Sequence, residues 1–106
     1  SAVLLLRALG DETRIKIMEH LVQHDYCVRA LSCRLGCSEA SVSQHLKILR
    51  EAGLVRGEKR GYWVHYSVCS ETIQELLNSL YTLIFKEKKK DNGKRGESNG
   101  ISPKLD

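Results

Sequence analysis

Hydrophobic residues recur with helical spacing in the first part of the chain. Asp11, which follows Gly10, is a good N-cap, and an apolar stripe begins soon after it. The stripe consists of Ile15, Met18, Leu21 and Val22, with Ile17 widening it. These positions predict a helix that fades near residues 24–25. The apolar run at residues 3–9 is too short to be stable alone, so we expect it to pack against another surface, such as a second subunit.

Two further helices are expected on either side of a Gly-Cys-Ser link. The first should direct Val28, Leu31 and Leu35 inward and end at Gly36 in a left-handed conformation. Ser38 is a good N-cap for the second, which should end at Gly53. The buried stripe of this second helix is expected to be Val42, Leu46 and Leu49. Two short helices joined in this way predict a helix-turn-helix.

After residue 53 the apolar period changes from 3.6 to 2, which is typical of strands. Tyr62, Val64, Tyr66 and Val68 would share one face, with Trp63, His65 and Ser67 on the other. We expect the chain to turn around residues 58–61 and to form a two-stranded hairpin with basic residues at its tip.

A long helix capped by Ser70 should follow the hairpin. Its apolar positions are Ile73, Leu76, Leu77, Leu80 and Ile84, broadened by Tyr81, Leu83 and Phe85. This is more apolar surface than so small a domain would cover, and dimerisation would bury it. The fold expected is mainly α with a small β-hairpin (α+β), a winged helix-turn-helix that dimerises through its terminal helices. We expect one domain over residues 1–90, followed by a flexible polar tail over 91–106.

The composition favours an anionic partner. The net charge is +4, and residues 86–106 hold seven Lys and Arg against four Asp and Glu, an excess of three. Because no apolar run approaches the length of a membrane span and no secretory signal is apparent, we expect a cytoplasmic protein without a membrane partner. Paired carboxylates, a Gly-rich phosphate loop and a Ser/His/Asp order are not evident, so an enzyme is not expected.

The polar residues of the stretch "CSEASVSQHLKILREAGLV" are short and neutral, whereas most exposed helix faces carry Glu and Lys. Such side chains let a helix approach the major groove closely, where Gln can pair with adenine and Ser can serve several bases. The candidate DNA contacts on this helix are Ser38, Glu39, Ala40, Ser41, Ser43, Gln44, His45 and Lys47. Arg56, Lys59 and Arg60 would meet the DNA backbone or minor groove from the hairpin. Alternatively, each of these side chains is merely a solvated surface residue.

The segments "LGDETRIKIM", "LGCSEASVSQHLKILREAGLV" and "RGEKRGYWVHYSV", in this order and spacing, resemble the ArsR/SmtB family of winged-helix repressors. The resemblance covers roughly residues 3–85. It implies a homodimer built from the first and last helices that binds double-stranded DNA at an imperfect palindrome in a promoter. It also implies release of the DNA by a metal, a metalloid or a thiol-reactive signal.

The family's known inducer sites do not carry over intact. The arsenic and cadmium site resembles "CVC" with a further Cys, but in "YCVRALSC" only Cys27 matches, since Arg29 and Ser32 replace the other thiols. The family's zinc site on the last helix is absent, because the matching residues are poor zinc ligands. These residues are Ser70, Thr72, Leu83 and Lys86.

Other thiols and imidazoles remain candidates for a thiophilic ion (zinc, arsenic, cadmium or copper) or for redox chemistry. Cys33 lies on the first helix of the helix-turn-helix and Cys37 lies in its link, while His20, His24 and Cys27 form a second group. Cys69 precedes the last helix and is a candidate redox partner for a thiol in the helix-turn-helix. Each has a simpler interpretation, because Cys is often a buried small hydrophobe and His near a helix C-terminus is favoured by the dipole.

The leading hypothesis is therefore a sequence-specific, homodimeric DNA-binding repressor released from its operator by a metal, metalloid or thiol-oxidising signal. The alternative is a winged-helix module that dimerises and binds protein, with basic residues that only increase solubility. The Gln and Ser side chains of the second helix favour DNA, whereas an acidic face would have favoured protein.

Overall fold

A computed structural model describes residues 1–90 of the chain, with side chains through Lys86. Its elements, in order, are α1 (Ala2–Leu9), α2 (Glu12–Gln23), α3 (Val28–Leu35), α4 (Glu39–Glu51), β1 (Val55–Arg60), β2 (Trp63–Val68) and α5 (Ser70–Lys90). The fold expected from the sequence, helices with one antiparallel hairpin, is confirmed. The predicted polar tail, residues 91–106, lies outside the described residues.

Helix ends follow the local chemistry in most places. The Asp11 side chain accepts a hydrogen bond from the Arg14 amide, and Ser38 accepts one from the Ser41 amide, each at 3.1 Å. Gly36 ends α3 with a φ of 70°, a conformation that costs Gly little. The prediction that Ser70 caps the last helix is wrong by one residue. Ser70 is already helical, and the carbonyl of Cys69 accepts from the Thr72 amide at 3.1 Å.

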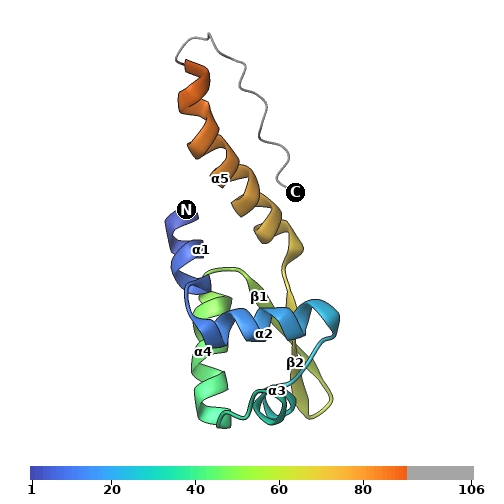
Figure 1. Ribbon diagram of the computed structural model, residues 1–106. Helices are drawn as coiled ribbons and strands as arrows, with labels where there is room; N and C mark the ends of the chain where they lie inside the picture. The colour runs from blue at the N-terminus through green and yellow to red at the C-terminus, as the bar shows by residue number, and fades with distance from the viewer. Residues whose placement is uncertain (91–106) are drawn as a thin grey trace.

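The elements are arranged with the terminal helices at one end and the helix-turn-helix at the other (Figure 1). Helices α1 and α5 lie at the top of the view. Helix α3, the start of α4 and the tip of the hairpin lie at the bottom. The two surfaces that the sequence assigned to dimerisation and to DNA are therefore at opposite ends of the molecule.

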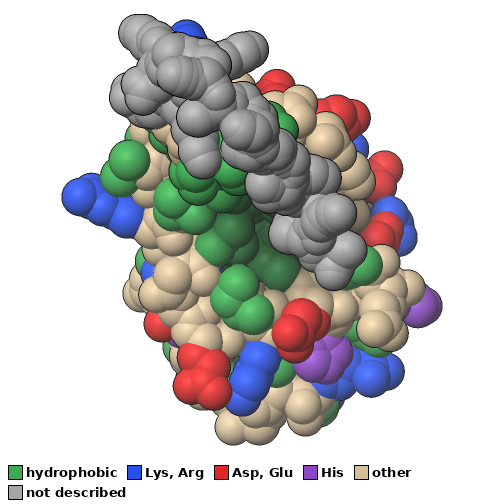
Figure 2. Space-filling view, turned by 45° about the horizontal axis from the view of Figure 1, so that its top comes forward, with side chains coloured by type: hydrophobic (Ala, Val, Ile, Leu, Met, Phe, Trp, Pro, Cys, Tyr) green, Lys and Arg blue, Asp and Glu red, His purple; other side chains and the backbone are tan. Residues whose placement is uncertain are grey.

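Hydrophobic side chains gather on the face that includes α1 and the described part of α5 (Figure 2). The side chains of this apolar face with more than half of their surface exposed are Val3, Leu4, Leu77, Tyr81, Leu83 and Ile84. On α5 only Leu76 is buried among the described side chains. An apolar patch of this kind is typical of a protein–protein interface.

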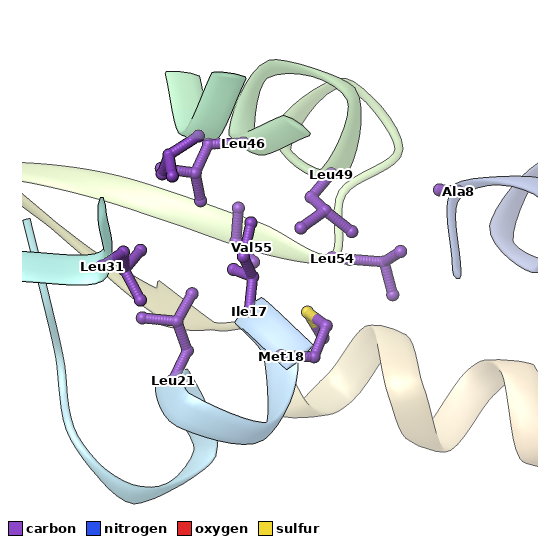
Figure 3. Packing of buried hydrophobic residues seen from close by; sticks show 10 residues of the cluster. Ala8, Ile17, Met18, Leu21, Leu31, Leu46, Leu49, Leu54 and Val55 are labelled. Carbon is purple, nitrogen blue, oxygen red and sulfur yellow. The ribbon is translucent and has the colours of Figure 1, made fainter. Parts of the chain in front are cut away.

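The core lies where α2, α3 and α4 meet the start of the hairpin (Figure 3). Its largest fully buried side chains are Ile17, Leu31, Leu46, Leu49, Leu54, Val42 and Val55. The stripe predicted for the second helix of the helix-turn-helix is thus confirmed, since Val42 and Leu49 have no exposed surface and Leu46 has 1%.

The inward face predicted for α2 is partly wrong. Met18 and Leu21 are buried, but Ile15 is 40% exposed and Val22 is 71% exposed, while Ile17 is completely buried. Positions 17, 18 and 21 form one side of the helix, and it is this side that packs on the core. Positions 15 and 22 lie seven residues apart on an adjacent strip that remains exposed.

The hairpin turn lies later than predicted. The strands pair from Val55 opposite Val68 to Arg60 opposite Trp63, so the turn consists of residues 61–62 rather than 58–61. Gly61 adopts a φ of 65°, which suits a two-residue hairpin turn. A bridge between Tyr26 and Tyr66, with N–O distances of 3.3 and 2.8 Å, ties the loop between α2 and α3 to β2.

The orientation of α2 leads to a test with two neighbouring residues. Leu21→Ala removes a side chain that is 3% exposed and should lower the free energy of unfolding by about 2–5 kcal/mol. Val22→Ala, the control, should change it by no more than about 0.5 kcal/mol because Val22 packs little. Denaturant unfolding followed by circular dichroism, at equal protein concentration, measures both. Equal losses would mean that both side chains face the core.

Candidate nucleic-acid interface

The outer side of α4 carries the residues that the sequence assigned to base recognition. Since Val42, Leu46 and Leu49 anchor one side of α4 in the core, the opposite side faces outward. The exposed side chains of this readout face are Glu39, Ala40, Ser43, Gln44 and Lys47. They offer an amide, a hydroxyl, an amine, a carboxylate and a methyl group, all of which can contact base edges in the major groove.

The first residues of α4 have partly different roles. The Ser38 oxygen already accepts the Ser41 amide hydrogen, so its hydroxyl hydrogen is available for an acceptor such as a phosphate oxygen. Ser41 is half-buried and offers less surface than Ser43. The positive end of the helix macrodipole at this terminus also favours a phosphate nearby.

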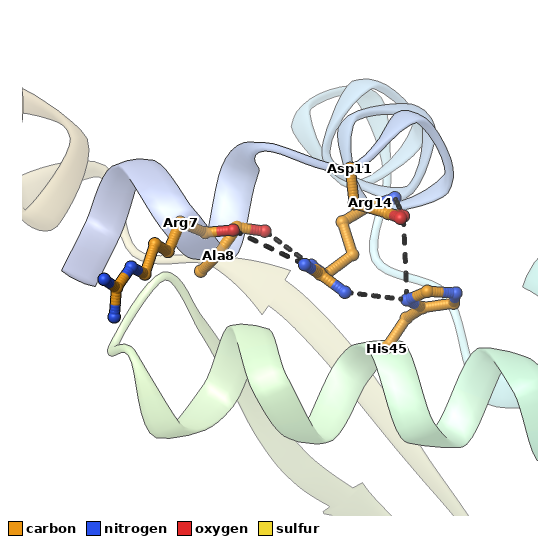
Figure 4. A network of polar contacts seen from close by, with 5 residues as sticks. All are labelled: Arg7, Ala8, Asp11, Arg14 and His45. Carbon is orange, nitrogen blue, oxygen red and sulfur yellow. Dashed lines mark hydrogen bonds and ion pairs between the residues drawn. The ribbon is translucent and has the colours of Figure 1, made fainter. Parts of the chain in front are cut away.

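His45 does not lie on the readout face. Its Nδ1 is 3.2 Å from Nη1 of Arg14 and 3.8 Å from Oδ2 of Asp11, and its side chain is 22% exposed (Figure 4). The ring therefore points toward the start of α2. Nδ1 of this candidate DNA contact is thus directed to a contact between helices, and a DNA contact by His45 stays a prediction.

The three basic residues assigned to the hairpin differ in their surroundings. Nη2 of Arg60 lies 2.7 Å from Oδ2 of Asp25 and 3.0 Å from Oε1 of Glu58. Hydrogen bonds to Asp25 and then to Glu58 raise the pKa of Arg60 above its ordinary value, and the two carboxylates offset its charge. Arg56 is 3.9 Å from Glu71. Lys59 is exposed and has no ion pair among residues 1–86, so its charge is the most available to a phosphate.

The candidate DNA contacts expected from the sequence did not include Arg29 and Arg34 of α3 or Tyr62 of the hairpin turn. The Arg29 guanidinium lies 5.9 Å from the Trp63 ring centroid, and that of Arg34 lies 4.6 Å from the Tyr26 ring. Tyr62 is 90% exposed at the hairpin tip. The two arginines were visible as basic residues of the first helix of the helix-turn-helix. Their direction, however, depends on how α3 packs, which the sequence does not give.

His20, His24 and Cys27, predicted as a group of metal ligands, do not come together in the structure. Within the part of the chain that the structure describes, no three His, Cys, Asp or Glu side chains converge on a point that could hold a metal ion. Nδ1 of His20 lies 2.8 Å from the Lys16 carbonyl oxygen, and Nδ1 of His24 lies 2.8 Å from that of Asp25. Both rings pack against Tyr26, at centroid distances of 6.2 and 5.0 Å respectively.

All four thiols are free, and they differ in exposure. Cys33 is exposed on α3, whereas Cys27, Cys37 and Cys69 are half-buried. Cys37 packs against the core, with its sulfur 3.8 Å from the Leu35 carbonyl oxygen. The bridge between Tyr26 and Tyr66 is antiparallel, so Cys27 continues away from Cys69. Cys69 lies three residues beyond Tyr66, about 10 Å along the strand, so these two thiols are not neighbours.

Known proteins share this arrangement of recognition helix and hairpin. A family model described as bacterial regulatory protein, arsR family, matches residues 11–56. The transcriptional activator HlyU of Vibrio cholerae is 37% identical over 82 residues, which cover 77% of this chain and 76% of that protein. The chain belongs to the ArsR family.

Other ArsR-family relatives agree in fold and in kind of function. The arsenical resistance operon repressor of Bacillus subtilis is 35% identical over 83 residues, covering 77% of this chain and 79% of the relative. A solved ArsR-like transcriptional regulator from Rhodococcus sp. RHA1 superimposes with a TM-score of 0.79 at 26% identity, covering 84% of each chain. The protein is thus a winged helix-turn-helix transcriptional regulator, as the sequence predicted. No helix in residues 1–90 is long and apolar enough to span a membrane.

The readout face and the hairpin predict two different kinds of DNA contact. Gln44→Ala should lower discrimination between specific and random DNA by about 1–3 kcal/mol, because it removes an amide that can pair with a base. Lys59→Ala should weaken binding to both DNAs alike and lower the salt dependence. Fluorescence anisotropy at several salt concentrations measures both effects. If Gln44→Ala weakened both DNAs equally, Gln44 would not read bases.

Proposed function

We propose that this ArsR-family regulator binds an imperfect palindrome in a promoter as a homodimer and represses transcription. The observation that carries the proposal is the exposed readout face of α4, at the same end of the molecule as the tip of the hairpin (Figure 1). A recognition helix in the major groove with a hairpin beside it on the backbone accounts for both surfaces. One relative is named an activator and another a repressor, so the direction of regulation rests on this proposal.

The terminal helices support the homodimer. Their exposed apolar face would be buried by a second copy of the chain, and a twofold axis there would leave both recognition helices at the far end. Two such helices read half-sites about one helical turn apart, roughly 34 Å. The palindrome then mirrors the symmetry of the protein.

For the releasing signal, we propose chemistry at the thiols beside the helix-turn-helix link. Cys33 is exposed, and Cys37 lies directly before the Ser38 cap of α4. The Ser32 hydroxyl donates to the Cys37 carbonyl oxygen at 2.6 Å, so a modification here would disturb the turn that holds the recognition helix. The arsenical-resistance name of one relative agrees with a thiophilic signal, such as arsenite or zinc.

The function is tested with the reduced protein and a fluorescent fragment of its own promoter. We expect tight binding that a scrambled fragment of equal length does not compete away, because base contacts add to the phosphate contacts. Equal affinity for both fragments at several salt concentrations would contradict a sequence-specific regulator. It would instead favour the protein-interaction module.

The dimer is tested on α5. Leu77→Glu places a charge in the exposed apolar face and should shift the protein to monomers in analytical ultracentrifugation, with promoter affinity reduced at least tenfold. Thr82→Glu is the matched control, because helical spacing places it with Asn78 and Glu75 on the polar side of α5. Dissociation by both variants, or by neither, would mean that the dimer does not form through this face.

The thiol signal is tested by repeating the promoter titration with arsenite, zinc or a disulfide-forming oxidant. One of these should release the DNA from the native protein and fail to release it from Cys33→Ser or Cys37→Ser. Cys69→Ser removes a thiol between β2 and α5, and this variant should respond as the native protein does. Release that persists in both link variants would place the sensor elsewhere, and binding unaffected by all three reagents would make the cysteines structural.

A further inference from the structure

Three helices meet at the side chain of Arg14 (Figure 4). Its Nε donates to the Ala8 carbonyl oxygen at 2.6 Å, and Nη2 donates to the Arg7 carbonyl oxygen at 3.4 Å. Its Nη1 lies 3.2 Å from Nδ1 of His45. Arg14 belongs to α2, the two carbonyl groups belong to the last turn of α1, and His45 belongs to α4. One half-buried guanidinium therefore contacts both of the other helices.

The α1 side of this contact follows from helix chemistry. The last carbonyl groups of a helix have no amide partner within it, and a cation near that end is favoured by the macrodipole. The Ala8 carbonyl oxygen accepts from Arg14 at 2.6 Å. The Arg7 carbonyl oxygen accepts from the Gly10 amide at 3.2 Å as well as from Arg14. Arg14 thus holds the end of α1 by bonds that do not depend on apolar packing.

The α4 side requires a particular state of His45. A guanidinium can only donate hydrogen bonds, so in this contact Nδ1 of His45 accepts from Nη1 of Arg14. Asp11 faces the same ring at 3.8 Å. The hydrogen bond from the Arg14 amide holds the pKa of Asp11 below its ordinary value, with a smaller contribution from the charge of Arg14. Asp11 is therefore ionised, and its charge favours the cationic side chain of Arg14.

Packing between α1 and α4 is otherwise incomplete. An open groove of about 300 Å³ lies between them, lined by Leu4, Ala8, Ile48 and Ala52, with Arg7, Arg14 and Glu51 at its polar positions. Direct apolar contact between α1 and α4 is therefore limited along this groove. Within the described residues, Arg14 is the side chain that hydrogen-bonds to both α1 and α4.

We propose that Arg14 is a positioning residue that couples the dimerisation helix α1 to the recognition helix α4 through His45. A displacement of α1 at the dimer interface pulls on the guanidinium, and the contact with His45 passes the displacement to α4 two turns after its Ser38 cap. This coupling rests on the proposed function, in which α1 lies in the dimer interface and α4 reads DNA. It assigns to His45 a part in DNA binding that requires no contact with DNA.

A double-mutant cycle tests the coupling. Arg14→Gln and His45→Leu should each reduce affinity for the promoter fragment by at least tenfold, while the double variant should be no weaker than either one. His45→Asn keeps an acceptor near the position of Nδ1 and should restore part of the affinity. Lys16→Gln, on the exposed part of the same helix, should bind as the native protein does.

Several controls separate positioning from loss of structure. Circular dichroism and ultracentrifugation should show folded dimers for each variant, and Arg14→Lys replaces Arg14→Gln if the latter unfolds. In the free protein, Arg14→Gln should also shift the ¹⁵N resonance of His45 Nδ1, whereas Lys16→Gln should not. Losses that multiply in the double variant, or an unchanged promoter affinity, would overturn the coupling. Absence of specific binding by the native protein would instead overturn the proposed function on which the coupling rests.

Discussion

The burial of one side of α4 is the constraint on which the rest of the structure depends. Val42, Leu46 and Leu49 pack against Ile17 and Leu31 in a single core, so the rotation of α4 about its own axis is fixed. Because that rotation is fixed, the short polar side chains of the opposite side form one readout face. The energy that holds the recognition surface therefore comes from apolar packing behind it and not from the surface residues themselves.

Polar contacts set how the surrounding elements meet this core. Asp11 and Ser38 cap α2 and α4, and Arg14 links the end of α1 to α4. The bridge between Tyr26 and Tyr66 holds the loop before α3 against the hairpin. The two ends of the molecule thus differ in character. One has an apolar face suited to a second copy, and the other has a polar face suited to DNA.

Much of this architecture was predictable because it follows from local rules. Helical spacing identified the stripe of α4, and the residue types at Asp11, Gly36 and Ser38 identified helix ends. The sequence did not predict correctly which side of a helix is buried where tertiary packing determines it. Ile15 and Val22 have the spacing of a buried face, yet the core lies on the side of Ile17. The hairpin turn begins at Gly61, which has a positive φ, so Lys59 and Arg60 lie in β1 and not in the turn as predicted.

The candidate site shows the same division. The exposed positions of α4 followed from its period, but the inward direction of His45 depends on a contact with Arg14, 31 positions earlier in the chain. The ion pair between Arg60 and Asp25 could not be predicted from the sequence either, because Asp25 lies in a separate loop. The resemblance supplied the family, which the relatives confirm. The signal stays a prediction, since the thiols of the described residues do not form a metal-binding group.

In the proposed homodimer, two recognition helices held by one apolar interface read two half-sites. Hydroxyl-radical footprinting of the native protein on its own promoter tests this most directly. We expect two protected segments related by twofold symmetry, with centres about 10 base pairs apart. A single protected segment, or protection without any fixed position, would contradict it.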